Sequence, residues 1–352
     1  MLSDGRSSAF NPEHGGALNA AAEYFDIPRE QWLDLSTGIN PDGWPVPEIP
    51  AHVWQRLPEE NDQLRAAAAD YYSSPYLTPV AGSQQGIQFL PMLYQGQNKK
   101  KNPAVWVTAG SYSEHGKAWA EQGYRVRRVA CDHINQLLRQ QPVDVLILVN
   151  PDNPSGHRWP KEQLLHWWEM LQSRGGWLIV DEAFMDCTPE HSLCSDMPKK
   201  GLFVLRSLGK FFGLAGVRSG FLFAAADQCR RIEKLQGPWA LNYPAQYLSE
   251  LALADEDWIK AQRQSLAQAS LRLAGLLEEK LNQRCEGTDL FQTLYFPRAE
   301  KLFFHLAKAG ILTRYLKPTS QSAAGIRFGL PGTNEDHWSR LADSLTTFNQ
   351  EN

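Results

Sequence analysis

Short apolar runs alternate with helical segments through the middle of the chain, from about residue 78 to 224. The runs DVLILV (144–149) and GWLIV (176–180) are typical of strands buried on both faces. PKEQLLHWWEMLQ (160–172), which lies between them, is typical of a helix packed on such strands. This alternation predicts an α/β domain with a mostly parallel sheet between helices.

The pattern changes on both sides of this region. GALNAAAEYFDI (16–27) predicts a short helix, and LDLSTGINP (33–41) predicts a brief strand that ends in turn residues. After GPWALNYPAQ (237–246) we expect a long helical region over about 244–282, then two short strands framing a helix. A strand at GIRFGLPG and a helix over 334–349 complete a smaller α+β domain. The expected division is an N-terminal arm of the small domain (1–35), a large domain (36–238) and a small C-terminal domain (239–352).

Composition narrows the class of protein. The 352 residues are 43% hydrophobic and 21% charged, which suits a chain with two packed cores. A formal net charge of −4 argues against nucleic acid or an anionic membrane as the main partner. We find no apolar run near the ~20 residues of a membrane-spanning helix and no apolar signal segment. The five cysteines lack metal-ligand spacing, so we expect reduced thiols, no metal site and a cytoplasmic location.

Polar residues that could bind a ligand or take part in catalysis follow the predicted strands. Asp181 ends the strand WLIVD, and Asn153 lies in the turn NPDNPSG after another strand. AGSQQG (81–86) combines small residues with a predicted helix start, which suits a phosphate. Lys210 stands in the apolar stretch RSLGKFFGLAG. Its side chain can either reach out into solvent or act as a nucleophile, since loss of water favours the neutral amine. Ligands of parallel sheets bind beyond the carboxyl ends of strands, where these residues are expected.

The order of these motifs resembles the fold type I pyridoxal-phosphate enzymes of the aminotransferase superfamily. The motifs are GSQQ, Tyr112, NPDNPSG, DEAF and SLGK, with Arg218 eight positions after Lys210. Within that superfamily the chain is similar to the branch of histidinol-phosphate aminotransferases and threonine-phosphate decarboxylases. The resemblance implies a large domain with a mostly parallel seven-stranded sheet between helices, a smaller α+β domain, and a homodimer.

The resemblance also implies roles for the cofactor, pyridoxal 5'-phosphate. Lys210 would hold it covalently and later transfer a proton, Asp181 would pair with its ring nitrogen, and Tyr112 would stack on its ring. Asn153 would contact the phenolic oxygen. The expected phosphate ligands are Ser83, Gln84, Ser207 and Arg218.

For the substrate, the resemblance implies a small phosphorylated amino acid. Arg327 would bind the substrate carboxylate, and Arg314 would bind a second anion. The remaining expected substrate-binding residues are His14, Gly15, Asn40 and Asn153.

Two departures from the aminotransferase pattern bear on the reaction. Phe184 replaces the tyrosine of the usual DEAY motif and cannot donate a hydrogen bond to the phenolic oxygen. The resemblance implies decarboxylation here, because the decarboxylase branch carries this phenylalanine. Leu57 stands where related enzymes have a tyrosine that reaches the partner subunit's cofactor phosphate, and it has no hydroxyl to donate to that phosphate. We therefore expect decarboxylation of L-threonine O-3-phosphate to (R)-1-amino-2-propanol O-2-phosphate in cobalamin biosynthesis.

Other interpretations remain open. The machinery also suits a histidinol-phosphate-type aminotransferase that uses a 2-oxo acid, because both reactions share the same cofactor chemistry. A more remote alternative is a catalytically silent scaffold protein. His115 is interpreted as a polar loop residue and Glu182 as a residue that supports a turn.

Overall fold

A computed structural model describes residues 10, 12–59, 62–97, 102–319 and 323–351. The described residues fall into two compact units. The small unit comprises those within 1–42, 154–156 and 263–352, and the large unit comprises those within 43–153 and 157–262.

The large unit is built on a seven-stranded sheet of order β2-β8-β7-β6-β5-β3-β4. Among these described strands, β8 is the one whose direction is opposite to that of the other six. Strands β5 to β8 are buried along their whole length because both faces of the sheet are covered. The expected seven-stranded, mostly parallel sheet is confirmed. Its strands are β2 (Leu77–Val80), β3 (Val105–Thr108), β4 (Val126–Val129), β5 (Val145–Val149), β6 (Trp177–Asp181), β7 (Leu202–Ser207) and β8 (Gly220–Phe223).

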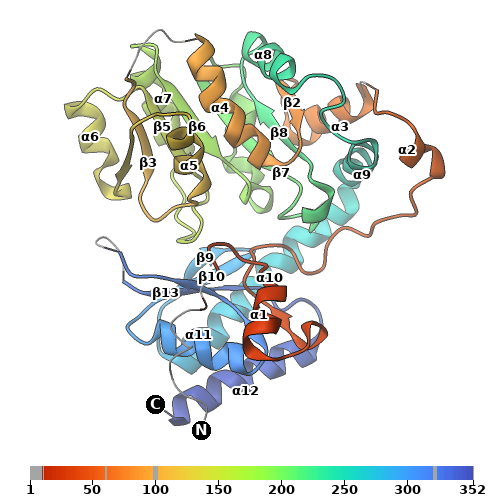
Figure 1. Cartoon of the computed structure of the whole chain (residues 1–352), viewed down its shortest axis with the longest axis vertical. Coiled ribbons are helices and arrows are strands. Elements are labelled where there is room, and N and C mark those ends of the chain that lie inside the picture. The colour runs from red at the N-terminus through yellow and green to blue at the C-terminus, as the bar shows by residue number, and fades with distance from the viewer. Residues whose placement is uncertain (1–9, 11, 60–61, 98–101, 320–322, 352) are drawn as a thin grey trace. The chain divides into compact units, whose positions relative to one another are not determined.

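Helices cover both faces of this sheet (Figure 1). On one face α4, α5 and α8 bury apolar side chains against strand residues such as Leu205 and Leu222. On the other face Tyr72 of α3 contacts the rings of Phe221 and Phe223, which alternate with Leu222 along β8. The helices of this unit are α2 (Ala51–Gln55), α3 (Asp62–Tyr72), α4 (Ser83–Gln97), α5 (Glu114–Glu121), α6 (Ile134–Gln140), α7 (Lys161–Gln172), α8 (Ala226–Gln236) and α9 (Tyr243–Ala254).

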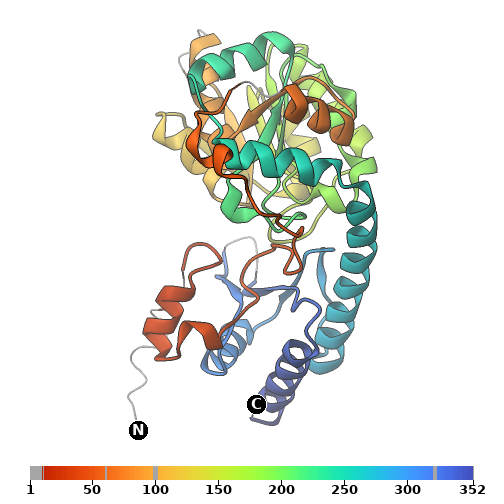
Figure 2. The same cartoon turned by 90° about the vertical axis from the view of Figure 1, so that its right-hand side faces the viewer.

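The small unit contains a four-stranded antiparallel sheet of order β12-β13-β10-β9 and a parallel pair, β1 and β11. Helix α10 packs along the sheet (Figure 2), where Ser270 donates to the Thr288 carbonyl at 2.9 Å and accepts from Gln292 at 2.7 Å. Its strands are β1 (Leu33–Asp34), β9 (Glu286–Thr288), β10 (Phe291–Tyr295), β11 (Ile311–Leu312), β12 (Arg314–Leu316) and β13 (Gly325–Gly329). Its helices are α1 (Leu18–Phe25), α11 (Ala299–Lys308), α12 (Glu335–Glu351) and most of α10 (Glu256–Leu281).

Single turns of 3-10 helix complete the secondary structure. They lie at Arg29–Gln31, Cys131–His133, Met185–Cys187, Pro189–His191, Cys194–Asp196 and Ala215–Val217.

Local hydrogen bonds interrupt two segments that the sequence pattern predicted to be continuous. The helical region at 244–282 is two helices, because the Asp255 carboxylate accepts from the Trp258 amide at 3.1 Å and starts α10. The strand expected over 33–41 stops at Asp34, whose carboxylate accepts from the Ser36 amide at 2.9 Å and forms a turn. The compact units change at 42/43 and 262/263, whereas the sequence placed the domain boundaries after 35 and 238.

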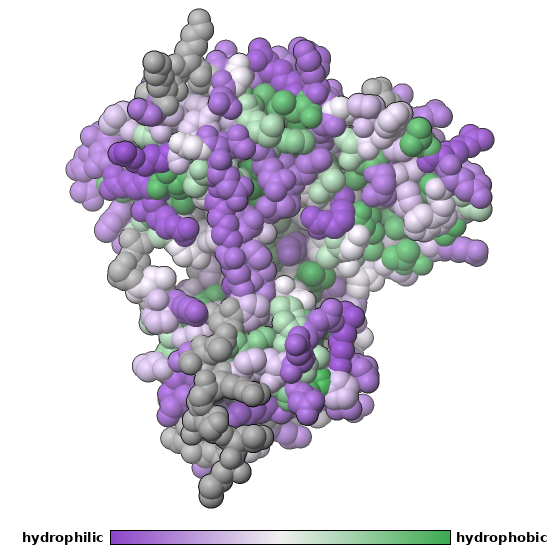
Figure 3. Space-filling view, viewed as in Figure 1, coloured by the Kyte–Doolittle hydropathy of each residue, from purple (hydrophilic) through white to green (hydrophobic). Residues whose placement is uncertain are grey.

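The surface carries a few exposed large apolar side chains. Trp54, Leu57 and Trp239 are each at least 60% exposed. Figure 3 shows a mainly hydrophilic face with hydrophobic areas on the side where Figure 1 places α2. Among the described residues we find no helix long and apolar enough to cross a membrane.

Candidate active site

Three strand ends meet at one edge of the sheet in the large unit. Val80 ends β2 and Ser207 ends β7, and both are paired with Gly220 at the start of β8. Since β8 lies between β2 and β7, the segments that follow Val80 and Ser207 emerge side by side. These segments carry Ser83 and Lys210.

Close backbone approaches at this edge suit an anion. A Cβ atom at Gly82, which has a φ of +73°, would lie 2.7 Å from Nη2 of Arg218. A Cβ atom at Gly220 would lie 3.0 Å from the Ser83 amide nitrogen. Ser83 begins the 15-residue helix α4, whose first amides have no partner within the helix. A helix N-terminus beside a guanidinium group is a suitable environment for a phosphate.

Asp181 is buried at the end of β6 and pairs with a histidine. His115 Nε2 lies 2.9 Å from Oδ2 of Asp181, and the second oxygen accepts from the Ala183 amide at 3.1 Å. His115 is only 2% exposed and lies in the first turn of α5. Its interpretation as a polar loop residue is therefore wrong. The sequence signal was its position in the first turn of the helix after β3, but the partner lies 66 residues away.

Tyr112 and Gln84 are linked beside Asp181. The Tyr112 hydroxyl donates to Oε1 of Gln84 at 3.3 Å, and Nε2 of Gln84 donates to Glu114 at 3.2 Å. Burial, and next the charge of Asp181, raise the pKa of Tyr112 to about 12. Tyr112 is therefore a neutral phenol at physiological pH, held by Gln84 at the same sheet edge.

Lys210 is half-buried in an apolar setting. Its Nζ atom lies 5.5 Å from the ring centroid of Phe184, which is 4% exposed. Phe211 and Phe212, the next residues in the chain, are fully buried. The ring of Phe184 supplies a cation–π contact and no proton donor, as the sequence indicated.

Asn153 is half-buried in the loop that follows β5. The preceding residue, Asp152, is 3% exposed, accepts from the hydroxyl of Ser111 and donates its amide to the His157 carbonyl at 2.8 Å. Ser111 precedes Tyr112, so this contact ties the Asn153 loop to the Tyr112 loop.

Within the small unit, two arginines occupy opposite positions on neighbouring strands. Arg314 of β12 pairs in register with Arg327 of β13, which places both side chains on one face. Arg327 is 6% exposed, and burial and next the charge of Arg314 lower its pKa to about 10. Two guanidinium groups on one face favour an anion between them.

The N-terminal segment of the small unit packs against these arginines. Arg314 donates to the carbonyl oxygens of Pro12 and Glu13, and Arg327 donates to the Ser36 carbonyl at 2.6 Å. A Cβ atom at Gly15 would lie 2.3 Å from the same Ser36 oxygen, so glycine is required there.

The other two substrate residues expected in this unit differ in exposure. His14 is exposed, next to Gly15. Asn40 is 3% exposed, and its side-chain oxygen accepts from the Asp42 amide at 3.0 Å, which makes it a turn-forming residue.

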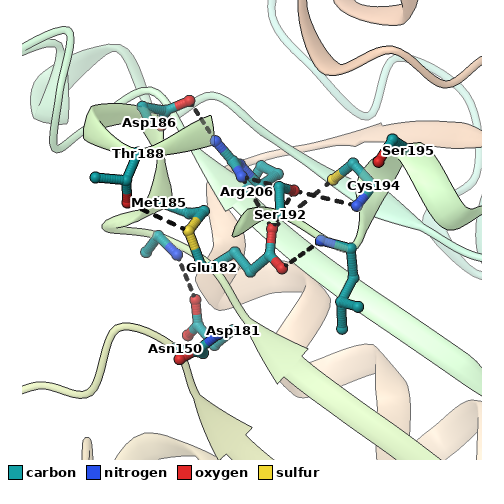
Figure 4. Close-up of polar contacts among 12 residues, drawn as sticks. Asn150, Asp181, Glu182, Met185, Asp186, Thr188, Ser192, Cys194, Ser195 and Arg206 are labelled. Atoms are coloured by element: carbon teal, nitrogen blue, oxygen red, sulfur yellow. Dashed lines mark hydrogen bonds and ion pairs between the residues drawn. The ribbon is translucent and has the colours of Figure 1, made fainter. Parts of the chain in front are cut away.

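One cluster was missed by the sequence interpretation. Glu182 does not merely support a turn, because it is fully buried and accepts from Nη1 of Arg206 at 2.9 Å (Figure 4). Arg206 is 1% exposed and also contacts Asp186 at 2.5 Å. An arginine inside the apolar strand LFVLRS was the available signal, since a buried charge requires partners.

The sequence pattern of the family Aminotransferase class I and II matches residues 53–345. The chain belongs to this family. Threonine-phosphate decarboxylase of Pseudomonas aeruginosa is 43% identical to this aminotransferase-family chain over 338 residues, which cover 96% of the chain and 98% of that protein.

Solved structures share the fold of this aminotransferase-family chain. Histidinol-phosphate aminotransferase from Sinorhizobium meliloti in complex with pyridoxal-5'-phosphate has a TM-score of 0.78 at 18% identity, covering 99% of this chain and 97% of its own. L-threonine-O-3-phosphate decarboxylase from Porphyromonas gingivalis has a TM-score of 0.73 at 16% identity, covering 90% and 99%. The resemblance expected from the motifs is confirmed.

Proposed function

We propose that this chain is a pyridoxal-phosphate-dependent lyase that decarboxylates L-threonine O-3-phosphate. The product is (R)-1-amino-2-propanol O-2-phosphate, a precursor in cobalamin biosynthesis. The observation that carries the proposal is the 43% identity, over almost the whole of both chains, to a protein named threonine-phosphate decarboxylase. Phe184 beside Lys210 supports the same reaction.

The large unit fits the proposed cofactor. Gly82 and Gly220 leave room for the Ser83 amide and the Arg218 guanidinium group to approach one small anion. We assign the cofactor phosphate to Ser83, Gln84, Ser207 and Arg218. We assign its ring to Tyr112, Asn153 and Asp181, and its covalent attachment to Lys210.

When bound, the cofactor supplies an electron sink at the substrate α-carbon. Asp181 is suited to hold a positive charge on a ring nitrogen, because the buried carboxylate is oriented by His115 at 2.9 Å and by the Ala183 amide. Lys210 lies in an apolar neighbourhood and is the one amine assigned to this site. We therefore assign to Lys210 the transfer of a proton to the substrate α-carbon.

The proposed substrate carries two anionic groups, a carboxylate and a phosphate. Arg327 and Arg314 offer two cationic groups on one face of the small sheet. We assign the substrate carboxylate to Arg327 and the phosphate to Arg314, with His14, Gly15 and Asn40 beside them. The bond of the α-carbon that aligns with the electron sink would determine which reaction occurs, because only an aligned bond is weakened.

The test is an incubation of the purified chain with pyridoxal phosphate and L-threonine O-3-phosphate. We expect release of CO2 and formation of the aminopropanol phosphate. Borohydride should trap the cofactor on Lys210, and Lys210→Ala should abolish both the label and turnover. Lys200→Ala, an exposed residue, is the matched control and should retain them. Amino transfer to a 2-oxo acid without CO2 would support the aminotransferase alternative, and absence of any reaction would support a silent scaffold.

We also propose a homodimer. The exposed apolar side chains of Trp54, Leu57 and Trp239 support an interface on the large unit. Light scattering of the purified chain should give twice the 39.7 kDa mass of one copy.

A further inference from the structure

A buried ion-pair cluster lies directly behind the proposed cofactor site. Arg206 donates from Nη1 to Glu182 at 2.9 Å and from Nη2 to Asp186 at 2.5 Å. All three side chains are at most 1% exposed. Figure 4 shows Arg206 between the two carboxylates, with Ser192 beside it.

The register of β6 and β7 determines on which face of the sheet this cluster lies. Asp181 is paired with Leu205, so Glu182 and Arg206 are the next residues along the same two strands. The Glu182 amide continues the strand pairing by donating to the Leu205 carbonyl at 2.9 Å. Successive strand side chains alternate between faces. Glu182 and Arg206 therefore lie on the face opposite to that of Asp181.

The same alternation applies to the phosphate side of the proposed site. Ser207 follows Arg206, so its side chain and that of Asp181 share one face of the sheet. Glu182 follows Asp181, the proposed ring ligand, and Arg206 precedes Ser207, a proposed phosphate ligand. The Glu182–Arg206 ion pair therefore links the two strand ends that carry these ligands. No atom of the pair needs to touch the cofactor for this coupling.

The cluster holds both carboxylates tightly. Glu182 also accepts from the Ser192 hydroxyl at 2.5 Å and from the Leu193 amide at 2.8 Å. Asp186 also accepts from the Tyr71 hydroxyl at 3.1 Å, and the Arg206 guanidinium group lies 4.7 Å from the Tyr72 ring centroid. Burial raises the pKa of Glu182, although Arg206 opposes this effect.

We propose that Arg206 and Glu182 are positioning residues, which set the spacing between Asp181 and Ser207 from the back of the sheet. This inference rests on the proposed function, because Asp181 and Ser207 matter here as cofactor ligands. A buried charge pair is weak evidence for stability, since well-packed apolar replacements are often neutral. If the ion pair fixes the positions of Asp181 and Ser207, it has a function that an apolar pair of residues would lack.

The test compares a double variant that removes both charges with a matched pair elsewhere. Glu182→Leu with Arg206→Met is built in an Asp186→Asn background, because the Asp186 carboxylate would otherwise stay buried without its Arg206 partner. Arg272→Met with Glu335→Leu is the control, because that ion pair, at 2.6 Å, is exposed and lies in the small unit. Folding is checked by circular dichroism, and the dissociation constant of pyridoxal phosphate is measured on the cofactor-free proteins.

We expect the dissociation constant of the Glu182/Arg206 double variant to rise by about tenfold or more, because small displacements of ligands are costly. Its kcat should fall while its KM for L-threonine O-3-phosphate stays within about threefold, since the proposed substrate ligands lie mainly in the small unit. The pH dependence of the bound cofactor's absorbance should also shift, as expected if Asp181 moves relative to the ring. The control variant should match the wild type in all three measurements.

A folded double variant with unchanged cofactor affinity, kcat and absorbance profile would overturn the inference. If the double variant does not fold, Arg206→Lys decides the question. It keeps the charge but cannot bond to both carboxylates with a planar fork, so weaker cofactor binding supports the inference and unchanged binding overturns it. If the wild type itself binds no pyridoxal phosphate, the proposed function fails, whatever the variants do.

Discussion

His115 Nε2 lies 2.9 Å from the Asp181 carboxylate, and both side chains are at most 4% exposed. The two residues come from different elements, the helix α5 and the end of β6. Burial excludes water from competing for this contact, so each side chain determines the orientation of the other.

The first prediction concerns this pair. His115→Ala should weaken pyridoxal phosphate binding by about 10- to 100-fold, the usual range for one hydrogen bond to a charged group. Asp181→Ala should have a larger effect, and the double variant should resemble Asp181→Ala alone because the two residues act together. Cofactor titration of the four proteins forms a double-mutant cycle. Additive losses would show that His115 does not act through Asp181.

A second prediction concerns Gly82. Gly82→Ala should weaken cofactor binding and lower the free energy of unfolding by about 1–3 kcal/mol, because φ is +73° and the new Cβ meets Arg218. Gly96→Ala in α4 is the control, since nothing lies within 4 Å of its Cβ position. The control should be unchanged or more stable by about 0.5–1 kcal/mol. Equal cofactor affinity in both variants would contradict the assigned phosphate site.

A third prediction concerns alkaline pH. The pKa of Tyr112 is raised from 10.0 to about 12, so the folded state favours the neutral phenol. The resulting stability is fully present below about pH 10 and is lost as the pH rises toward about 12. Denaturant unfolding of the wild type and Tyr112→Phe between pH 8 and 12 should show the wild type losing more stability across that window. Parallel curves would argue against burial of the Tyr112 hydroxyl.

A fourth prediction separates the proposed substrate and cofactor ligands. Arg327→Gln should reduce kcat/KM for L-threonine O-3-phosphate by about 10- to 100-fold through loss of charge-assisted hydrogen bonds. Pyridoxal phosphate affinity should stay the same, because Arg327 is assigned to the substrate alone. Arg340→Gln, another arginine of the small unit, is the control and should keep normal kinetics. A large loss of cofactor affinity in Arg327→Gln would contradict the assignment.

Local pattern was sufficient for much of the architecture. The buried strand runs 144–149 and 176–180 predicted β5 and β6, since strands covered on both faces must be apolar throughout. The motifs DEAF and SLGK placed Asp181 and Lys210 near strand ends because a parallel sheet collects its loops at one edge. The end of α9 at Ala254 was missed, because a single carboxylate, that of Asp255, starts the next helix.

The sequence by itself determined the alternation of strands and helices, the family and the order of the candidate chemical groups, because these depend on neighbours along the chain. Only the tertiary structure decided that His115 faces Asp181 and that Arg206 joins Glu182 behind the sheet. The partners in these pairs are 66 and 24 residues apart. Their meeting depends on strand order and register, which bring distant residues together and assign each side chain to one face of the sheet.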